Sequence, residues 1–290
     1  MSPNPGSIPL ATFALLAACV GGSSAGSARA AGQATTTEIP AAQAGPARFF
    51  WRDGMRLGHP AAERIVNANG SPRITSPARY DQFWREVGPR LARWAGQPCV
   101  GLNPNFVAAL LAKESGFDPT ATSAVPAVGF AQITAEADED MLQRVPTIPC
   151  MADAQAWPRH PLVHSPAATK AKVDSLIASG AVNARTEYLL DPAPATRAAM
   201  YQLRIVADIW RTHDEYAPFA RRVLNAGAPL TEDQVLDLVT VSYNQGYRYV
   251  HDLMLRHGAA WKDHLNDESR DYLERIRTYT LLFQAAPAGR

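Results

Sequence analysis

The chain has 290 residues, of which 47% are hydrophobic and 19% are charged, so it can form at least one globular domain with a sizeable core. Its formal net charge is +1. This argues against a nucleic-acid-binding protein, because such proteins concentrate basic residues on one face. We therefore expect no nucleic acid among its partners.

The first predicted element is an export signal over residues 1–18. Ile8–Val20 is an apolar run too short to span a bilayer, as in the core of a signal peptide. Leu16–Cys19 resembles the lipidation motif of bacterial lipoproteins, whereas Ala28–Ala30 resembles an ordinary cleavage site. We expect an exported, periplasmic protein whose lipidated Cys19 anchors it to the outer membrane. The alternative is a soluble periplasmic or secreted form.

Two segments precede the main domain. Residues 19–47 are rich in Gly, Ala, Ser, Thr and Gln, which predicts a flexible tether. Residues 48–98 contain a helical pattern from Tyr80 to Trp94, interrupted by a proline. We predict that 48–98 forms an N-terminal helical extension that packs on the main domain.

The chain has three cysteines, Cys19, Cys99 and Cys150. If Cys19 carries lipid, the other two remain as a candidate disulfide, because disulfides persist in an oxidising compartment. The alternative is two unrelated buried thiols. None of the cysteines has the C-x-x-C spacing of a zinc site, so we expect no metal.

The residue of greatest interest lies in a helix that begins at Asn103–Asn105. Asn is a good N-cap, Pro is favoured at the first helical position, and Gly116 supplies a stop. Glu114 falls in line with an apolar stripe in the last turn. Partial burial and the negative end of the helix would both raise its pKa, as a general acid requires. The alternative is a structural carboxylate at the edge of the core.

The sequence that follows Glu114 favours catalysis. Glu114–Ser123 and Ala127–Thr134 resemble the soluble lytic transglycosylase family, whose pattern is E-S-x-F-x-x-x-A-x-S followed by G-A-x-G-L-M-Q. Pro126 and the Phe130–Ala131 pair depart from this pattern. They change the expected lining of the substrate groove more than the acid itself.

Later segments resemble the same family in the same order. Leu190–Pro192 is similar to its D-P segment, Ser242–Gly246 to its A-Y-N-A-G segment, and Glu268–Leu273 to its E-T-R-x-Y-V segment. A capping-box pattern at Thr231 and Gln234 predicts the start of the helix that leads to the second of these. The resemblance covers about residues 104–283.

The resemblance implies a mainly α, lysozyme-like catalytic domain, which we place at residues 99–286. Residues 137–189 are rich in proline and predict an irregular insertion with one helical piece around 166–179. An acidic run at 136–140 predicts a solvated face. His160 and His164 lie on either side of a proline with no third ligand, so they do not suggest a metal site.

The resemblance also implies the reaction. Peptidoglycan glycan strands would be cut between N-acetylmuramic acid and N-acetylglucosamine, with Glu114 as the single acid and base and a 1,6-anhydro product. No cofactor is needed. One alternative is a goose-type-lysozyme-like muramidase, in which water attacks. The other is a non-catalytic peptidoglycan-binding scaffold that kept the fold.

Five further residues are candidates for substrate binding. Tyr243 is expected to place its hydroxyl near Glu114, and Gln132 to donate to the glycan. For each candidate a structural role is the alternative: a core aromatic, or a local hydrogen bond at a turn or helix end. The set is Ser115, Ser123, Gln132, Tyr243 and Asn244.

Overall fold

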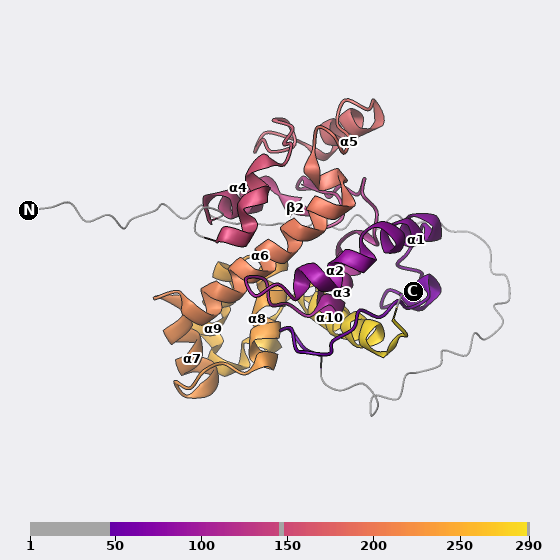
Figure 1. Cartoon of the computed structure of the whole chain (residues 1–290). Helices are drawn as coiled ribbons and strands as arrows, with labels where there is room; N and C mark the ends of the chain where they lie inside the picture. The colour runs from indigo at the N-terminus through magenta and orange to yellow at the C-terminus, as the bar shows by residue number, and fades with distance from the viewer. Residues whose placement is uncertain (1–46, 145–147, 289–290) are drawn as a thin grey trace, which may run out of the picture.

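The computed structural model describes residues 47–144 and 148–288 (Figure 1). It is mainly helical, which confirms the predicted class. The α-helices are α1 (Pro77–Glu86), α2 (Gly88–Ala95), α3 (Pro104–Ser115), α4 (Ala135–Arg144), α5 (Lys170–Ala178), α6 (Pro192–Thr212), α7 (Tyr216–Asn225), α8 (Glu232–Gln245), α9 (Tyr247–His257) and α10 (Asp267–Ala285). Short 3-10 helices are η1 (Ala62–Arg64), η3 (Pro149–Ala156), η4 (Tyr188–Leu190) and η5 (Gly258–His264). Strands β1 (Ala127–Val128) and β2 (Ile133–Thr134) form an antiparallel pair.

Helix α3 is the centre of the core. Its start is as predicted: the Asn103 side chain accepts from the backbone N–H of Asn105 at 3.0 Å, and Pro104 follows the cap. Every residue from Pro104 to Ala112 is buried, so α3 is apolar on all sides rather than along one stripe. The chain leaves the helix at Gly116, which adopts a left-handed conformation with φ of 62°.

Helix α10 packs along α3 in the opposite direction (Figure 1). Near the start of α3, the Asn105 side chain accepts from Gly58 N–H at 3.0 Å, and Gly58 forms a β-bridge with Ala288, just after α10. At the other end, Tyr272 in the first turns of α10 contacts Glu114. Helices α6 and α8 also pack together, and both contact this pair.

The N-terminal segment is helical where the sequence has its helical pattern, and it shares the main core. Residues 47–76 contain only η1 and isolated bridges, and the helices run from Pro77 to Ala95. Phe83 of α1 packs against Phe117 and Phe130, with ring centroids 4.7 and 5.7 Å apart. Because those partners belong to the motif region, this segment is an integral layer of the fold.

The region 137–189 begins inside a helix that was not predicted. Thr134 accepts from the backbone N–H of Ala137 at 3.2 Å and so starts α4, whose Met141 is buried. Later in the region, α5 (Lys170–Ala178) matches the one helical piece that the sequence predicted. A disulfide joins Cys99 and Cys150, with Cα atoms 6.2 Å apart, and ties η3 to the end of the N-terminal segment.

The acidic run at 136–140 was predicted to form a solvated face, but Asp138 within it is buried and only 2% exposed. Its carboxylate accepts from Arg159 Nε at 2.8 Å and from the Tyr188 hydroxyl at 2.5 Å. His164, dismissed at the sequence level, lies between two buried carboxylates, 3.2 Å from Asp138 and 2.9 Å from Glu187. These contacts supply the partners that a buried carboxylate requires. They also hold α4 and η4 together.

The proposed export signal, the tether and Cys19 lie outside the described residues. Among the helices that the structure does describe, none combines the length and the apolar character needed to cross a bilayer.

Candidate active site

Glu114 is the next-to-last residue of α3. The residue is partly buried: α10 and Arg73 pack around its carboxyl group, while part of the side chain stays accessible. Gly116 makes this packing possible, since a Cβ there would lie 2.7 Å from the carbonyl oxygen of Arg73. The chain therefore turns away tightly after Glu114 and leaves the carboxyl group at the end of the central helix.

The direct partner of Glu114 is Tyr272, whose hydroxyl donates to Glu114 Oε1. Tyr272 is 3% exposed, and its ring lies 5.7 Å from the Lys113 ammonium. Tyr272 belongs to the Glu268–Leu273 segment that is similar to the family, but the sequence alone indicated no role for it. Because 158 positions separate the two residues, only the packing of α10 on α3 brings them together.

The pKa of Glu114 is raised from 4.5 to about 7. Burial is the largest cause, since it disfavours the charged form. The hydrogen bond from Tyr272 and the charges of Arg73 and Lys113 act in the opposite direction, while the nearby carboxylate of Glu268 adds to the rise. Near neutral pH the group is therefore present both as acid and as base.

The helix dipole contributes less than the sequence suggested. Arg73 donates to the carbonyl oxygens of Ala112 and Lys113, at 2.8 and 2.5 Å, and so neutralises the negative end of α3. Lys113 in turn pairs with Asp271 at 2.5 Å. Burial, rather than the end of the helix, accounts for the raised pKa.

Tyr243 lies near Glu114 but does not bind it. Its hydroxyl donates to the Ala131 carbonyl oxygen at 2.8 Å. Burial raises the pKa of Tyr243, and the charge of Glu114 raises it further, which places the two groups within electrostatic reach. The hydroxyl that binds the acid directly belongs to Tyr272, and a contact of Tyr243 with substrate stays a prediction.

The hydroxyls of Ser115 and Ser123 serve local structure. Ser115 Oγ donates to the Leu111 carbonyl oxygen one turn back, at 3.3 Å. Ser123 Oγ donates to the Val125 carbonyl oxygen and accepts from the backbone N–H of Ala127 at 3.1 Å. These are the local hydrogen bonds that the sequence analysis gave as alternatives.

Gln132 and Asn244 are also engaged within the protein. Gln132 Nε2 donates to the carbonyl oxygens of Ala121 and Gly129, at 3.0 and 2.9 Å. Asn244 accepts from Gln245 Nε2 at 2.8 Å, and its own amide donates to Glu268 Oε1 at 3.5 Å. Asn244 thus links the α8 motif to the carboxylate that lies near Glu114.

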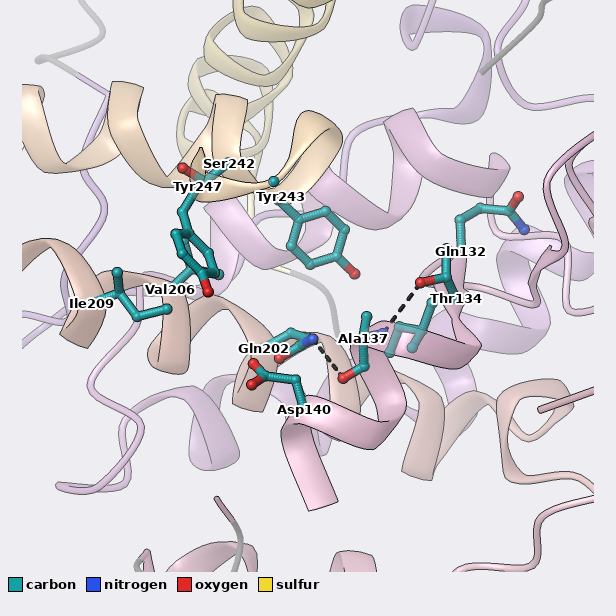
Figure 2. Close-up of a pocket in the computed structure, with 12 residues that line it drawn as sticks. Gln132, Thr134, Ala137, Asp140, Gln202, Val206, Ile209, Ser242, Tyr243 and Tyr247 are labelled. Atoms are coloured by element: carbon teal, nitrogen blue, oxygen red, sulfur yellow. Dashed lines mark hydrogen bonds between the residues drawn. The ribbon is translucent and has the colours of Figure 1, made fainter. Parts of the chain in front are cut away.

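A small cavity of about 60 Å³ lies between α4, α6, α8 and α9 (Figure 2). Gln132 and Tyr243 line it from one side, and Gln202, Val206 and Ile209 line it from α6. Gln202 Nε2 donates to the Ala137 carbonyl oxygen at 2.8 Å, while its Oε1 is buried without a partner. The cavity therefore combines an apolar wall with polar groups that include the unpartnered Gln202 acceptor, and Tyr243, whose pKa is raised by the charge of Glu114, lines it too.

Close packing against Leu189 explains why the motif has a glycine at position 129. It adopts φ of 75°, and a Cβ there would lie 1.8 Å from the Leu189 carbonyl oxygen. The β1–β2 turn can therefore press against η4, which leads into α6. This contact fixes the distance between the motif and the helix that carries Gln202.

Among the described residues, no group of three or more His, Cys, Asp or Glu side chains is arranged to hold a metal ion. The chemistry available at the site is proton transfer by Glu114, with Tyr272, Arg73 and Lys113 around it.

One family model matches the part of the chain that carries Glu114. The family model described as the transglycosylase SLT domain matches residues 97–151, a stretch that includes Glu114, Gly129 and Gln132. The match confirms the resemblance to the soluble lytic transglycosylases and supports a lytic-transglycosylase-type function that acts on peptidoglycan. No curated protein and no solved structure matches the chain.

Proposed function

We propose that this protein is a peptidoglycan lytic transglycosylase that cuts the β-1,4 bond between N-acetylmuramic acid and N-acetylglucosamine. One observation carries the proposal: Glu114 is a partly buried acid with a pKa of about 7, at the end of the central helix of the matched domain. A group with this pKa can give a proton and take one back at neutral pH.

In the first step, Glu114 protonates the bridging oxygen as the bond from that oxygen to muramyl C1 breaks. N-acetylglucosamine leaves with a free hydroxyl, and the carbonyl oxygen of the muramyl N-acetyl group stabilises the positive charge at C1. Because Tyr272 donates to Oε1, the proton to be transferred resides on Oε2.

In the second step, the Glu114 carboxylate takes the proton from the muramyl C6 hydroxyl. The C6 oxygen bonds to C1 and closes the 1,6-anhydro ring, so no water is consumed and Glu114 regains its proton. Tyr272 stabilises the carboxylate between the two steps, because a hydrogen bond to the charged form favours that form.

Mass spectrometry of the muropeptides released from purified sacculi tests the proposal. Products that end in 1,6-anhydro-muramic acid are the expected result. Products that end in hydrated, reducing muramic acid would exclude the lyase reaction.

Replacing Tyr272 by Phe is expected to lower kcat/KM about tenfold, because one hydrogen bond to a charged group is lost. That hydrogen bond lowers the pKa of Glu114, so its removal raises the pKa above about 7. The first step needs protonated Glu114, so the high-pH decline of kcat/KM should move to higher pH. A pH–rate profile that falls in amplitude without moving would show that Tyr272 has only a packing role.

A muramidase reaction, in which water attacks C1, has one observation in its favour. Glu268 is a second carboxylate close enough to raise the pKa of Glu114, and most glycosidases use two carboxylates. In the lyase reaction Glu268 has no chemical role. It accepts a hydrogen bond from the Asn244 side-chain amide and adds negative charge near Glu114.

Replacing Glu268 by Gln separates the two reactions. The lyase account predicts that activity persists and that the pKa of Glu114 falls, which moves the high-pH decline of kcat/KM to lower pH. If Glu268 were the base that activates water, the same variant would lose nearly all activity, by about 100-fold or more. The measurement is muropeptide release from sacculi as a function of pH.

For location, we propose export to the periplasm with a lipid on Cys19 that anchors the protein to the outer membrane. The apolar run before Cys19 and the Cys99–Cys150 disulfide support this proposal, since disulfides persist in oxidising compartments. Metabolic labelling with a fatty-acid analogue tests it: Cys19→Ser should abolish labelling of the mature protein.

A further inference from the structure

A groove lies near the N-terminal end of α3, whereas Glu114 lies at the C-terminal end of the same helix. It encloses about 530 Å³ between α1, α2, residues 55–59 and Ala288. The Asn105 side chain, at the start of α3, accepts from Gly58 N–H and donates to the Arg56 carbonyl oxygen. Glu114 lies nine positions further along the helix than Asn105, a distance of about 14 Å. The groove is therefore separate from the acid.

The base of the groove is aromatic and closely packed. The rings of His59 and Trp84 stack with centroids 4.4 Å apart and an interplanar angle of 21°. Gly88 permits this arrangement, because a Cβ there would lie 2.7 Å from the Trp84 ring. Such a surface suits an aliphatic chain or a planar amide.

Side chains of both charges line the groove but form no ion pairs with one another. Asp81, Trp84 and Arg85 of α1 line it, as expected for residues spaced i, i+3 and i+4 along a helix, and Gly88 lines it from the start of α2. Asp81 and Arg85 are four residues apart, the spacing of the Asp140–Arg144 and Asp271–Arg275 ion pairs of this chain. Within the part of the chain that the structure describes, neither forms an ion pair, and nor does Arg56, which also lines the groove. The charge of Asp81 does act on His59, because it opposes the lowering of the His59 pKa by burial.

We propose that this groove binds the peptide stems of peptidoglycan, through a zwitterionic group that carries a carboxylate and an ammonium. The carboxylate would pair with Arg56 and Arg85, the ammonium with Asp81, and the aliphatic chain would lie on the His59–Trp84 stack. The volume is within the usual range for a small-molecule site, about 300–1,000 Å³. The choice of this ligand rests on the proposed function, because peptidoglycan carries such peptides along its glycan strands.

Such a site would hold the enzyme on the polymer away from the bond being cut. A stem on a neighbouring strand, or farther along the same strand, could occupy the groove while the glycan lies at Glu114. The groove would then favour peptide-bearing strands over bare glycan.

Calorimetric titration of the full chain tests the proposal. The probe is a synthetic stem tetrapeptide whose diamino acid has a free ammonium and a free carboxylate. The wild type should bind it, and Arg85→Ala should weaken binding about tenfold or more. Asp81→Asn should weaken binding of this probe but not of a probe whose ammonium is acetylated. Arg185→Ala, which removes an exposed arginine outside the groove, should bind like the wild type.

Three results would overturn the proposal: no binding to the wild type, equal losses in Arg85→Ala and Arg185→Ala, or equally strong, Arg85-dependent binding of a peptide-free glycan. The last would assign the groove to the lactyl carboxylates of muramic acid. Glu114→Gln should bind the tetrapeptide like the wild type, so the groove is tested independently of catalysis. If peptide binds as predicted but sacculi yield no anhydro products, the groove stands and the proposed reaction fails.

Discussion

Replacing Glu114 by Gln is expected to reduce the release of muropeptides from sacculi at least about a thousandfold, near the upper range for loss of a general acid–base group. The amide keeps the size of the side chain and can still accept from Tyr272. It cannot give a proton to the bridging oxygen or take one from the C6 hydroxyl, so both steps stop. Glu139→Gln, on the exposed side of α4, is the matched control and should keep full activity.

The same substitution should leave the protein at least as stable as the wild type at pH 8. The pKa of Glu114 in the folded protein, about 7, lies above its ordinary value of 4.5. As pH rises through this interval the unfolded chain loses its proton first, so the wild type loses stability between about pH 4.5 and 7. Gln cannot ionise and avoids this loss. A thermal melt with a lower midpoint for Glu114→Gln at pH 8 would contradict the burial argument.

If Glu114→Gln and the wild type release equally little material, the protein is a binding scaffold rather than an enzyme. In that case both should still sediment with sacculi to the same extent.

Removing the Cys99–Cys150 disulfide is expected to destabilise the protein by about 4 kcal/mol. The bridge joins residues 51 positions apart, and closing a loop of that length restricts the unfolded chain by about this amount. The double variant Cys99→Ser/Cys150→Ser should show the loss in denaturant unfolding. The Asp138–Arg159 ion pair includes neither cysteine, so the double variant keeps it.

Both proteins in this comparison should carry Cys19→Ser, so that no third thiol can exchange. Reducing agent should lower the stability of the protein with the pair intact to that of the double variant, and should leave the double variant unchanged. An unfolding free energy that differs by less than about 1 kcal/mol between the two would show that the bridge does not constrain the unfolded chain.

Elements whose ends depend on local chemistry could be predicted from the sequence. The Asn103 cap, the proline after it and Gly116 set the bounds of α3, and the structure confirms all three. The capping box of Thr231 and Gln234 is also confirmed at the start of α8. In each case the deciding hydrogen bond joins residues two to four positions apart, so the signal is present in a short stretch of sequence.

Contacts between distant segments could not be predicted in this way. Tyr272 reaches Glu114 only because α10 packs along α3, and Asp138 is buried only because Arg159 and Tyr188 supply its partners. Nothing in an acidic run distinguishes the one carboxylate that turns inward. Met141, one turn further along α4, is buried on the same side, but this is seen only once the helix has formed.

The substrate-binding predictions show a different limit. The motif led to residues in the region of Glu114: the charge of Glu114 raises the pKa of Tyr243, and Gln132 lines the same cavity as Tyr243. Sequence similarity alone does not reveal that the side chains of Ser115, Ser123 and Gln132 donate hydrogen bonds to backbone carbonyl oxygens. Their contact with glycan stays a prediction.

The most direct test of the central claim is digestion of sacculi by the wild type in water enriched in oxygen-18. If Glu114 closes the anhydro ring with the sugar's own C6 oxygen, the new muramyl ends contain no heavy oxygen and are one water molecule lighter than reducing ends. Heavy oxygen at muramyl C1 of the released products would show that water attacks instead, and would contradict the account of Glu114 as the only acid and base.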